Sequence, residues 1–63
     1  MDNEKIGQLI YTLRKGKGMT QKQVADALFL SDRTISKWER GIGCPDITLL
    51  PQLAALFDIP IEN

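Results

Sequence analysis

A chain of 63 residues is long enough for one small domain, and such a domain buries only about 60% of the surface that its unfolded chain exposes. It has one cysteine, Cys44, and no histidine, so an intramolecular disulfide is impossible and the usual zinc-ligand sets are missing. The formal net charge is zero, and no apolar run resembles a membrane span or a signal peptide. We therefore expect a soluble, cytoplasmic single domain over residues 1–63, with no cofactor, no metal and an inert Cys44.

Charge is distributed unevenly along the chain. Between Arg14 and Arg40 there are seven basic and three acidic residues, an excess of four positive charges, and the flanks carry the opposite excess. A polyanion is attracted to the basic middle of such a dipolar molecule. This is only weak support for a nucleic-acid partner, because charged runs are usually solvated helix faces.

The first apolar segment predicts a helix. Ile6, Leu9, Ile10 and Leu13 recur at helical spacing, and Gly16 follows where a helix commonly ends. No segment of the sequence shows the strict alternation of a half-buried strand. The fold is therefore expected to be all-helical.

The second segment carries the sequence signature of a capped helix. The Thr20 hydroxyl can accept from the Gln23 amide while the Gln23 side chain reaches back, and Met19 and Val24 form a hydrophobic staple around this cap. The helix is expected to end near Leu28. A very short connection then leads to the next helix, so the two must cross at a steep angle.

The third helix is expected to begin after Ser31 as its N-cap and to run from about Asp32 to Arg40, stopping at Gly41. At 100° per residue, one face gathers hydrogen-bond donors, and Ile35 and Trp38 point the other way. A solvated amphipathic helix has the same pattern. The capped helix and tight turn before it favour a helix-turn-helix over about residues 20–40.

The start of the fourth helix is ambiguous. Asp46 is a good cap by residue type, but Pro51 would then lose a hydrogen bond in the second turn; Thr48 as the cap avoids this loss. The last residues, 59–63, look like the beginning of a truncated fifth helix.

The N-terminus of the second helix is suited to an anion. Free backbone N–H groups and the positive end of the helix dipole favour a phosphate there, and Gln21 and Lys22 lie at that end. We expect Gln21 to make this contact.

Two stretches together carry a family resemblance: residues 19–28 (MTQKQVADAL) and 31–41 (SDRTISKWERG), with 44–47 (CPDI) and Leu50-Pro51 beyond them. The chain resembles the XRE family of Cro- and phage-repressor-like transcriptional regulators over about residues 6–59. The resemblance implies a small lambda-repressor-like domain of four to five helices. It also implies binding to double-stranded operator DNA, usually as a homodimer on a near-palindromic site. We expect no membrane partner, and no small-molecule substrate within this domain.

The resemblance also assigns roles to residues. The positions that read bases in the family are Asp32, Arg33, Thr34 and Lys37 here. The positions that contact phosphates are Gln21, Lys22, Ser36 and Arg40. The structural ion pair of the family corresponds to Arg14 and Glu39, and as a partly exposed pair it is expected to contribute only about 0–1 kcal/mol.

The sequence departs from the family pattern at Phe29, where a glycine often provides a positive φ in the turn. A bulky residue there must accept strain or take a different turn. The second departure is the short C-terminus, since the fifth helix often contributes to dimer contacts in the family. We therefore expect either a fragment of a longer regulator or a domain that dimerises weakly on DNA.

An enzyme and a protein-interaction module are the two alternatives to a DNA-binding domain. An enzyme is disfavoured, because histidine, a Gly-rich phosphate loop and a metal-ligand set are all missing. The serious alternative is a protein-interaction module that uses the same helices, with Phe29, Ile42 and Ile61 as exposed apolar anchors.

Overall fold

A computed structural model describes residues 2–59, and within this range all regular structure is helical. The elements are α1 (Asn3–Gly16), α2 (Gln21–Ala27), α3 (Asp32–Glu39), the single 3₁₀ turn η1 (Ile47–Leu49) and α4 (Leu50–Leu56). The expectation of an all-helical fold is confirmed. A fifth helix was expected over residues 59–63, and all but the first of these lie outside the described residues.

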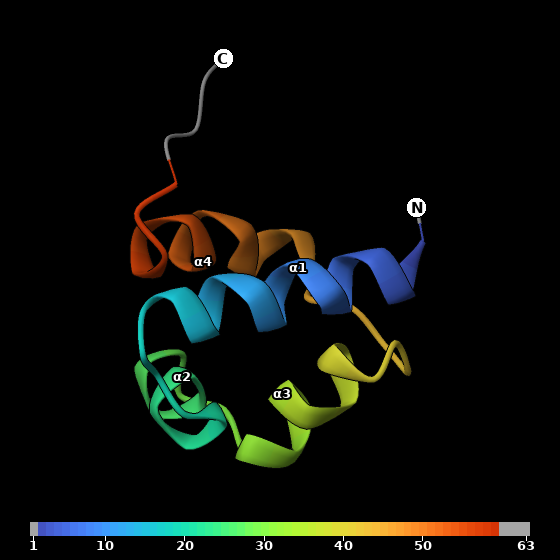
Figure 1. Ribbon diagram of the computed structural model, residues 1–63, viewed down its shortest axis with the longest axis horizontal. Coiled ribbons are helices and arrows are strands. Elements are labelled where there is room, and N and C mark those ends of the chain that lie inside the picture. The colour runs from blue at the N-terminus through green and yellow to red at the C-terminus, as the bar shows by residue number, and fades with distance from the viewer. Residues whose placement is uncertain (1, 60–63) are drawn as a thin grey trace.

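Helix α1 runs through the middle of the molecule, with α2 and α3 on one side and α4 on the other (Figure 1). Ile35 of α3 and Val24 of α2 are completely buried between these elements. The rest of the core comes from every α-helix and the residues that end them: Ile10, Ala25, Leu28, Trp38, Leu53 and Phe57. A core this small holds each helix in place through only a few side chains.

The predicted capping box of α2 is present. Thr20 Oγ1 accepts from the Gln23 backbone N at 3.0 Å, and Gln23 Oε1 accepts from the Thr20 backbone N at 2.8 Å. Ser31 is the N-cap of α3 as predicted, but its hydroxyl does not bond a helix N–H and instead lies 3.1 Å from Thr34 Oγ1. Helix α3 ends at Glu39, one residue earlier than expected, because Arg40 is its C-cap.

The ambiguity at the start of the fourth helix is resolved by η1. Asp46 caps this 3₁₀ turn, whereas the N-cap of α4 itself is Leu49, so neither Asp46 nor Thr48 caps the fourth helix. Thr48 donates to Asp46 Oδ1 from its backbone N at 3.0 Å and its hydroxyl at 3.2 Å, which lowers the pKa of that carboxyl. Helix α4 begins only at Leu50, so Pro51 lies in its first turn and loses no helical hydrogen bond.

The turn between α2 and α3 contains no glycine, yet one of its residues has the left-handed backbone conformation. Phe29 has φ +59°, and its side chain is 94% exposed. The sequence left either a strained residue or a different turn, and the structure has the strained residue at Phe29. A left-handed conformation costs a non-glycine residue about 1–2 kcal/mol.

We expect Phe29→Gly to stabilise the protein by about 0.5–1 kcal/mol, since relief of strain exceeds the extra flexibility of the unfolded chain. Phe29→Ala is the matched control, because it removes the exposed ring and leaves φ strained. Thermal denaturation of both variants tests this. An equal loss of stability in both would mean that the ring packs against the protein.

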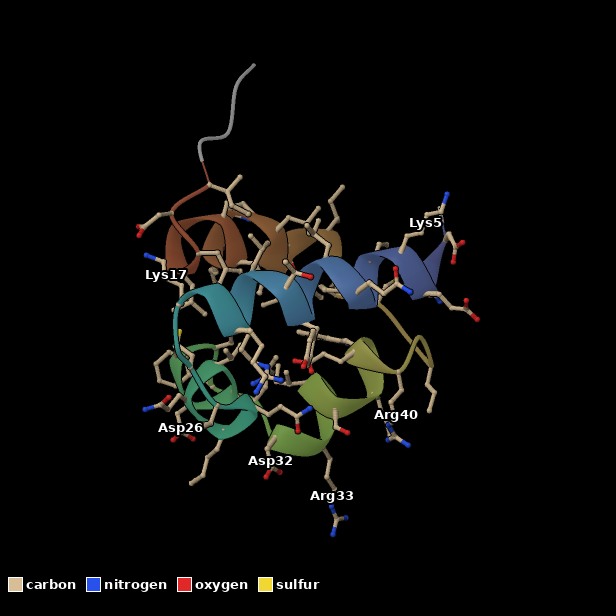
Figure 2. All side chains as sticks on the ribbon, viewed as in Figure 1. Lys5, Lys17, Asp26, Asp32, Arg33 and Arg40 are labelled. Atoms are coloured by element: carbon tan, nitrogen blue, oxygen red, sulfur yellow. The ribbon has the colours of Figure 1, made fainter. Side chains whose placement is uncertain are left out.

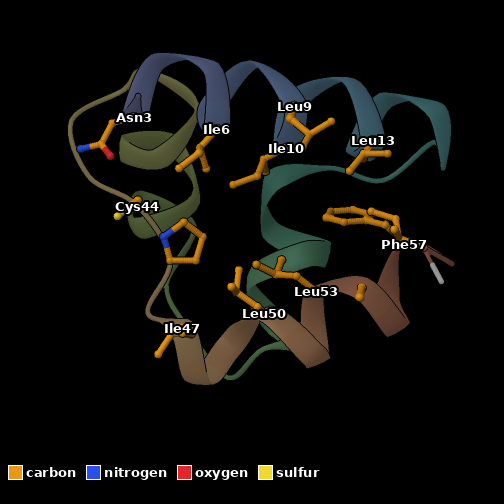
Figure 3. Close-up of a pocket in the computed structure, with 13 residues that line it drawn as sticks. Asn3, Ile6, Leu9, Ile10, Leu13, Cys44, Ile47, Leu50, Leu53 and Phe57 are labelled. Carbon is orange, nitrogen blue, oxygen red and sulfur yellow. The ribbon is translucent and has the colours of Figure 1, made fainter. Parts of the chain in front are cut away.

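An apolar groove of about 640 Å³ lies between α1 and α4 (Figure 3). Its walls include Ile6 and Leu9 of α1 and Leu50 of α4, and the exposed, free Cys44 lies at its edge. Helix α3 packs against another side of α1. No helix within residues 2–59 is both long and apolar enough to cross a bilayer.

Candidate nucleic-acid interface

Helix α3 presents one face to the core and the opposite face to solvent. Ile35 is fully buried and Trp38 is 6% exposed, so the indole points inward as the sequence predicted. Figure 2 shows Asp32, Arg33 and Arg40 projecting from the side of the molecule farthest from α4. The outward face of α3 is thus free to approach a large partner.

The four predicted base-reading residues share this helix but differ in accessibility. Asp32, Arg33 and Lys37 are exposed, and neither basic residue forms an ion pair within residues 2–59. Thr34 is half-buried, with its hydroxyl beside that of Ser31. Arg33 and Lys37 are therefore the most available hydrogen-bond donors on the helix.

The predicted phosphate contacts lie at the start of α2 and on α3 with its C-cap. Arg40 is exposed and its Nε donates to the backbone carbonyl of the half-buried Ser36 at 3.3 Å. Lys22 is exposed and lies 3.7 Å from Asp26, a loose pair one helical turn away. Gln21 is half-buried as the first residue of α2. Gln21 Nε2 donates to Glu39 Oε1 at 3.2 Å, so the start of α2 lies beside the end of α3.

Arg14 and Glu39 form an ion pair that joins α1 to the end of α3. Arg14 Nε and Nη2 donate to the two carboxylate oxygens at 2.6 and 2.9 Å, and Arg14 Nη1 donates to the Met19 carbonyl at 2.9 Å. The expectation of partial exposure is wrong, since the two side chains are only 8% and 7% exposed. The hydrogen bonds that Arg14 donates to Glu39 raise the pKa of Arg14 against the opposing effect of burial.

Gly7 is a positioning residue that the sequence reasoning missed. It is buried in the middle of α1, and a Cβ added there would lie 2.1 Å from the carbonyl oxygen of Trp38. The absence of a side chain at Gly7 lets the backbones of α1 and α3 touch, which fixes where α3 lies. The only sequence signal was a glycine inside a helical pattern, which commonly marks a packing requirement.

A capped helix, a tight turn and a second helix with a buried inner face and a polar outer face define a helix-turn-helix domain. The helix-turn-helix family model matches residues 10–62, and the chain belongs to this family, of the XRE type. These proteins are DNA-binding transcription regulators and not enzymes.

Two curated proteins are similar to the chain. The HTH-type transcriptional activator BcrR of Enterococcus faecalis is 42% identical over 61 residues, which cover 97% of this chain and 28% of that protein. The uncharacterized HTH-type transcriptional regulator RP497 of Rickettsia prowazekii (strain Madrid E) is 32% identical over 57 residues, 90% of this chain and 44% of that protein. The chain thus spans less than half of either relative. No solved structure matches it significantly.

Proposed function

We propose that the domain binds specific double-stranded DNA sequences by inserting α3 into the major groove. The observation that carries this proposal is the division of α3, with Trp38 buried on one side and Arg33 and Lys37 exposed on the other. B-DNA's major groove admits an α-helix, and N-terminal residues of such a helix contact base edges. The family membership supports the same function.

The side chains suit distinct roles in that complex. Arg33 and Lys37 can donate to guanine O6 and N7, Asp32 can accept from cytosine N4, and the Thr34 methyl can contact thymine. Phosphates would be bound by the surrounding residues Gln21, Lys22, Ser36 and Arg40. The base contacts select the sequence, whereas the phosphate contacts set the register.

We further propose that two copies bind together. Twofold symmetry would place their α3 helices in successive major grooves, about 34 Å apart, on a near-palindromic operator. Occupancy of that site would then repress or activate transcription; BcrR is named an activator. We also propose that the domain acts in the cytoplasm.

We expect Arg33→Ala to lose about 1–3 kcal/mol of binding on the preferred site and to relax preference at one base pair. Gln21→Ala should weaken binding to preferred and scrambled duplexes by the same factor. Lys5→Ala is the control, because Lys5 is exposed in the first turn of α1 and projects on the side of the molecule opposite to Arg33 (Figure 2). Titration of each variant against both duplexes measures this, and equal losses for Arg33→Ala on the two duplexes would contradict the base-reading role.

Salt dependence separates DNA binding from the protein-interaction alternative. Two of its proposed anchors are exposed, Phe29 at 94% and Ile42 at 61%, and Ile61 lies outside the described residues. DNA affinity should fall steeply with salt, and Lys22→Ala should reduce the slope of log K against log salt by about one. A binding constant nearly independent of salt would favour an apolar protein interface.

A further inference from the structure

Glu39 connects all three helices of the DNA-facing half of the molecule. Its Oε1 accepts from Arg14 Nη2 at 2.9 Å and from Gln21 Nε2 at 3.2 Å, while its Oε2 accepts from Arg14 Nε at 2.6 Å. Arg14 belongs to α1, Gln21 begins α2 and Glu39 ends α3. The carboxylate therefore does more than pair with Arg14, because it also holds the first side chain of α2.

The bond to Glu39 fixes the orientation of the Gln21 amide. An ionised carboxylate can only accept hydrogen bonds, so it must face the NH₂ group of Gln21 and not the carbonyl oxygen. One N–H is used by Glu39, which leaves the second N–H to donate elsewhere. Gln21 is the first residue of α2, where backbone N–H groups also lack helical partners.

A carboxylate beside a phosphate site is normally unfavourable, since like charges repel. Here Arg14 compensates the charge through two hydrogen bonds to Glu39, and the side chains of both residues are more than nine-tenths buried. The bond can therefore orient Gln21 without leaving a bare negative charge next to the DNA.

We propose that Glu39 is a positioning residue that holds the Gln21 amide ready to donate to a DNA phosphate. This proposal rests on the phosphate contact proposed above for Gln21. Glu39 then has a role beyond stabilising the fold, because it orients the Gln21 amide for the phosphate before the DNA binds. Orienting a donor in advance lowers the entropic cost of the contact when the complex forms.

The test is a double-mutant cycle with Gln21→Ala, Glu39→Gln and the double variant, titrated at one salt concentration against preferred and scrambled duplexes. The substitution Glu39→Gln keeps the shape of the side chain but removes the negative charge that binds Arg14 and Gln21. Gln52→Ala, on the exposed side of α4, controls for the loss of a glutamine. Circular dichroism establishes that each variant is folded.

We expect Glu39→Gln to weaken both duplexes by about the same factor as Gln21→Ala, with the ratio between duplexes unchanged. The double variant should bind no more weakly than the weaker single variant. If the losses of affinity in the two single variants multiply in the double variant, the two residues act independently and the positioning role is wrong. A changed ratio between the affinities for the two duplexes would also overturn it, because α3 itself would then have moved. If Gln21→Ala binds both duplexes as tightly as the unmodified protein, the phosphate contact proposed for Gln21 is wrong. If the Arg33-dependent preference for one duplex is still present in that case, the base-reading role of α3 stands without the phosphate contact.

A second measurement needs no variant and covers the case in which Glu39→Gln fails to fold. In the unmodified protein, the two side-chain N–H signals of Gln21 should be distinct in NMR spectra. On addition of duplex, one should shift strongly while the other, bonded to Glu39, keeps its position, and the signals of Gln52 should not change. Equal shifts of both Gln21 protons, or none, would overturn the proposal.

Discussion

Trp38→Ala should remove most or all of the stability of the domain. The indole is 6% exposed and packs in the core between α1 and α3, so its truncation leaves a cavity costing about 3–5 kcal/mol. A domain of 63 residues has roughly 3–9 kcal/mol in total at typical stabilities per residue. Thermal melting followed by circular dichroism should show a transition shifted far down or absent.

The matched control is Phe29→Ala, which truncates an aromatic side chain that is 94% exposed. Its melting temperature should stay near that of the unmodified protein. A Trp38→Ala variant that melted like this control would place the indole outside the core. The orientation of α3 described above would then be wrong.

Gly7→Ala is expected to destabilise the protein by roughly 1–3 kcal/mol or more, although alanine is the better helix former by about 1 kcal/mol. The added Cβ would lie 2.1 Å from the Trp38 carbonyl oxygen, whereas real Cβ atoms essentially never approach below 3.0 Å. Because the atom in the way belongs to the backbone, α1 and α3 must shift relative to each other at this contact. Urea denaturation measures the loss.

Gly16→Ala is the control for helix propensity, since a Cβ there meets nothing within 4 Å and Gly16 also belongs to α1. This variant should be unchanged or slightly more stable. The molecules of Gly7→Ala that remain folded should also bind DNA more weakly, because α3 is displaced. If the two glycine variants behaved alike, α1 and α3 would not be in backbone contact.

Features set by neighbouring residues could be predicted from the sequence. The Thr20–Gln23 capping box depends on four consecutive residues, and the inward direction of Trp38 follows from helical periodicity. The approximate limits of α2 and α3 follow for the same reason. Local hydrogen bonding and the pitch of the helix determine these features almost alone.

Features that join distant segments could not be predicted in this way. The close approach at Gly7 depends on how α1 crosses α3, and the burial of the Arg14–Glu39 pair depends on the same packing. The η1 turn was not predicted either. It separates the cap residue Asp46 from α4, so that Pro51 lies in the first turn of α4 and loses no helical hydrogen bond. No local pattern encodes these arrangements.

Several basic residues in the middle of the chain already have acidic partners. Of the basic residues between Arg14 and Arg40, Arg14 is bound to Glu39 and Lys17 to Asp58, while Lys22 lies near Asp26. The excess of positive charge in this stretch is therefore only partly available to DNA. Arg33, Lys37 and Arg40 are exposed along the end of the molecule that α3 forms. A short exposed row thus explains how a neutral domain could bind a polyanion.

The outward face of α3 is the surface that we propose meets the bases. The most direct test of this proposal is to map backbone amide chemical-shift changes in ¹⁵N-labelled protein while adding a duplex selected by this protein from a random pool. We expect the largest changes over Asp32–Lys37 and at Gln21 and Lys22, with Leu50 and Leu53 in the groove unchanged. Changes concentrated along the α1–α4 groove, with α3 unaffected, would contradict the claim.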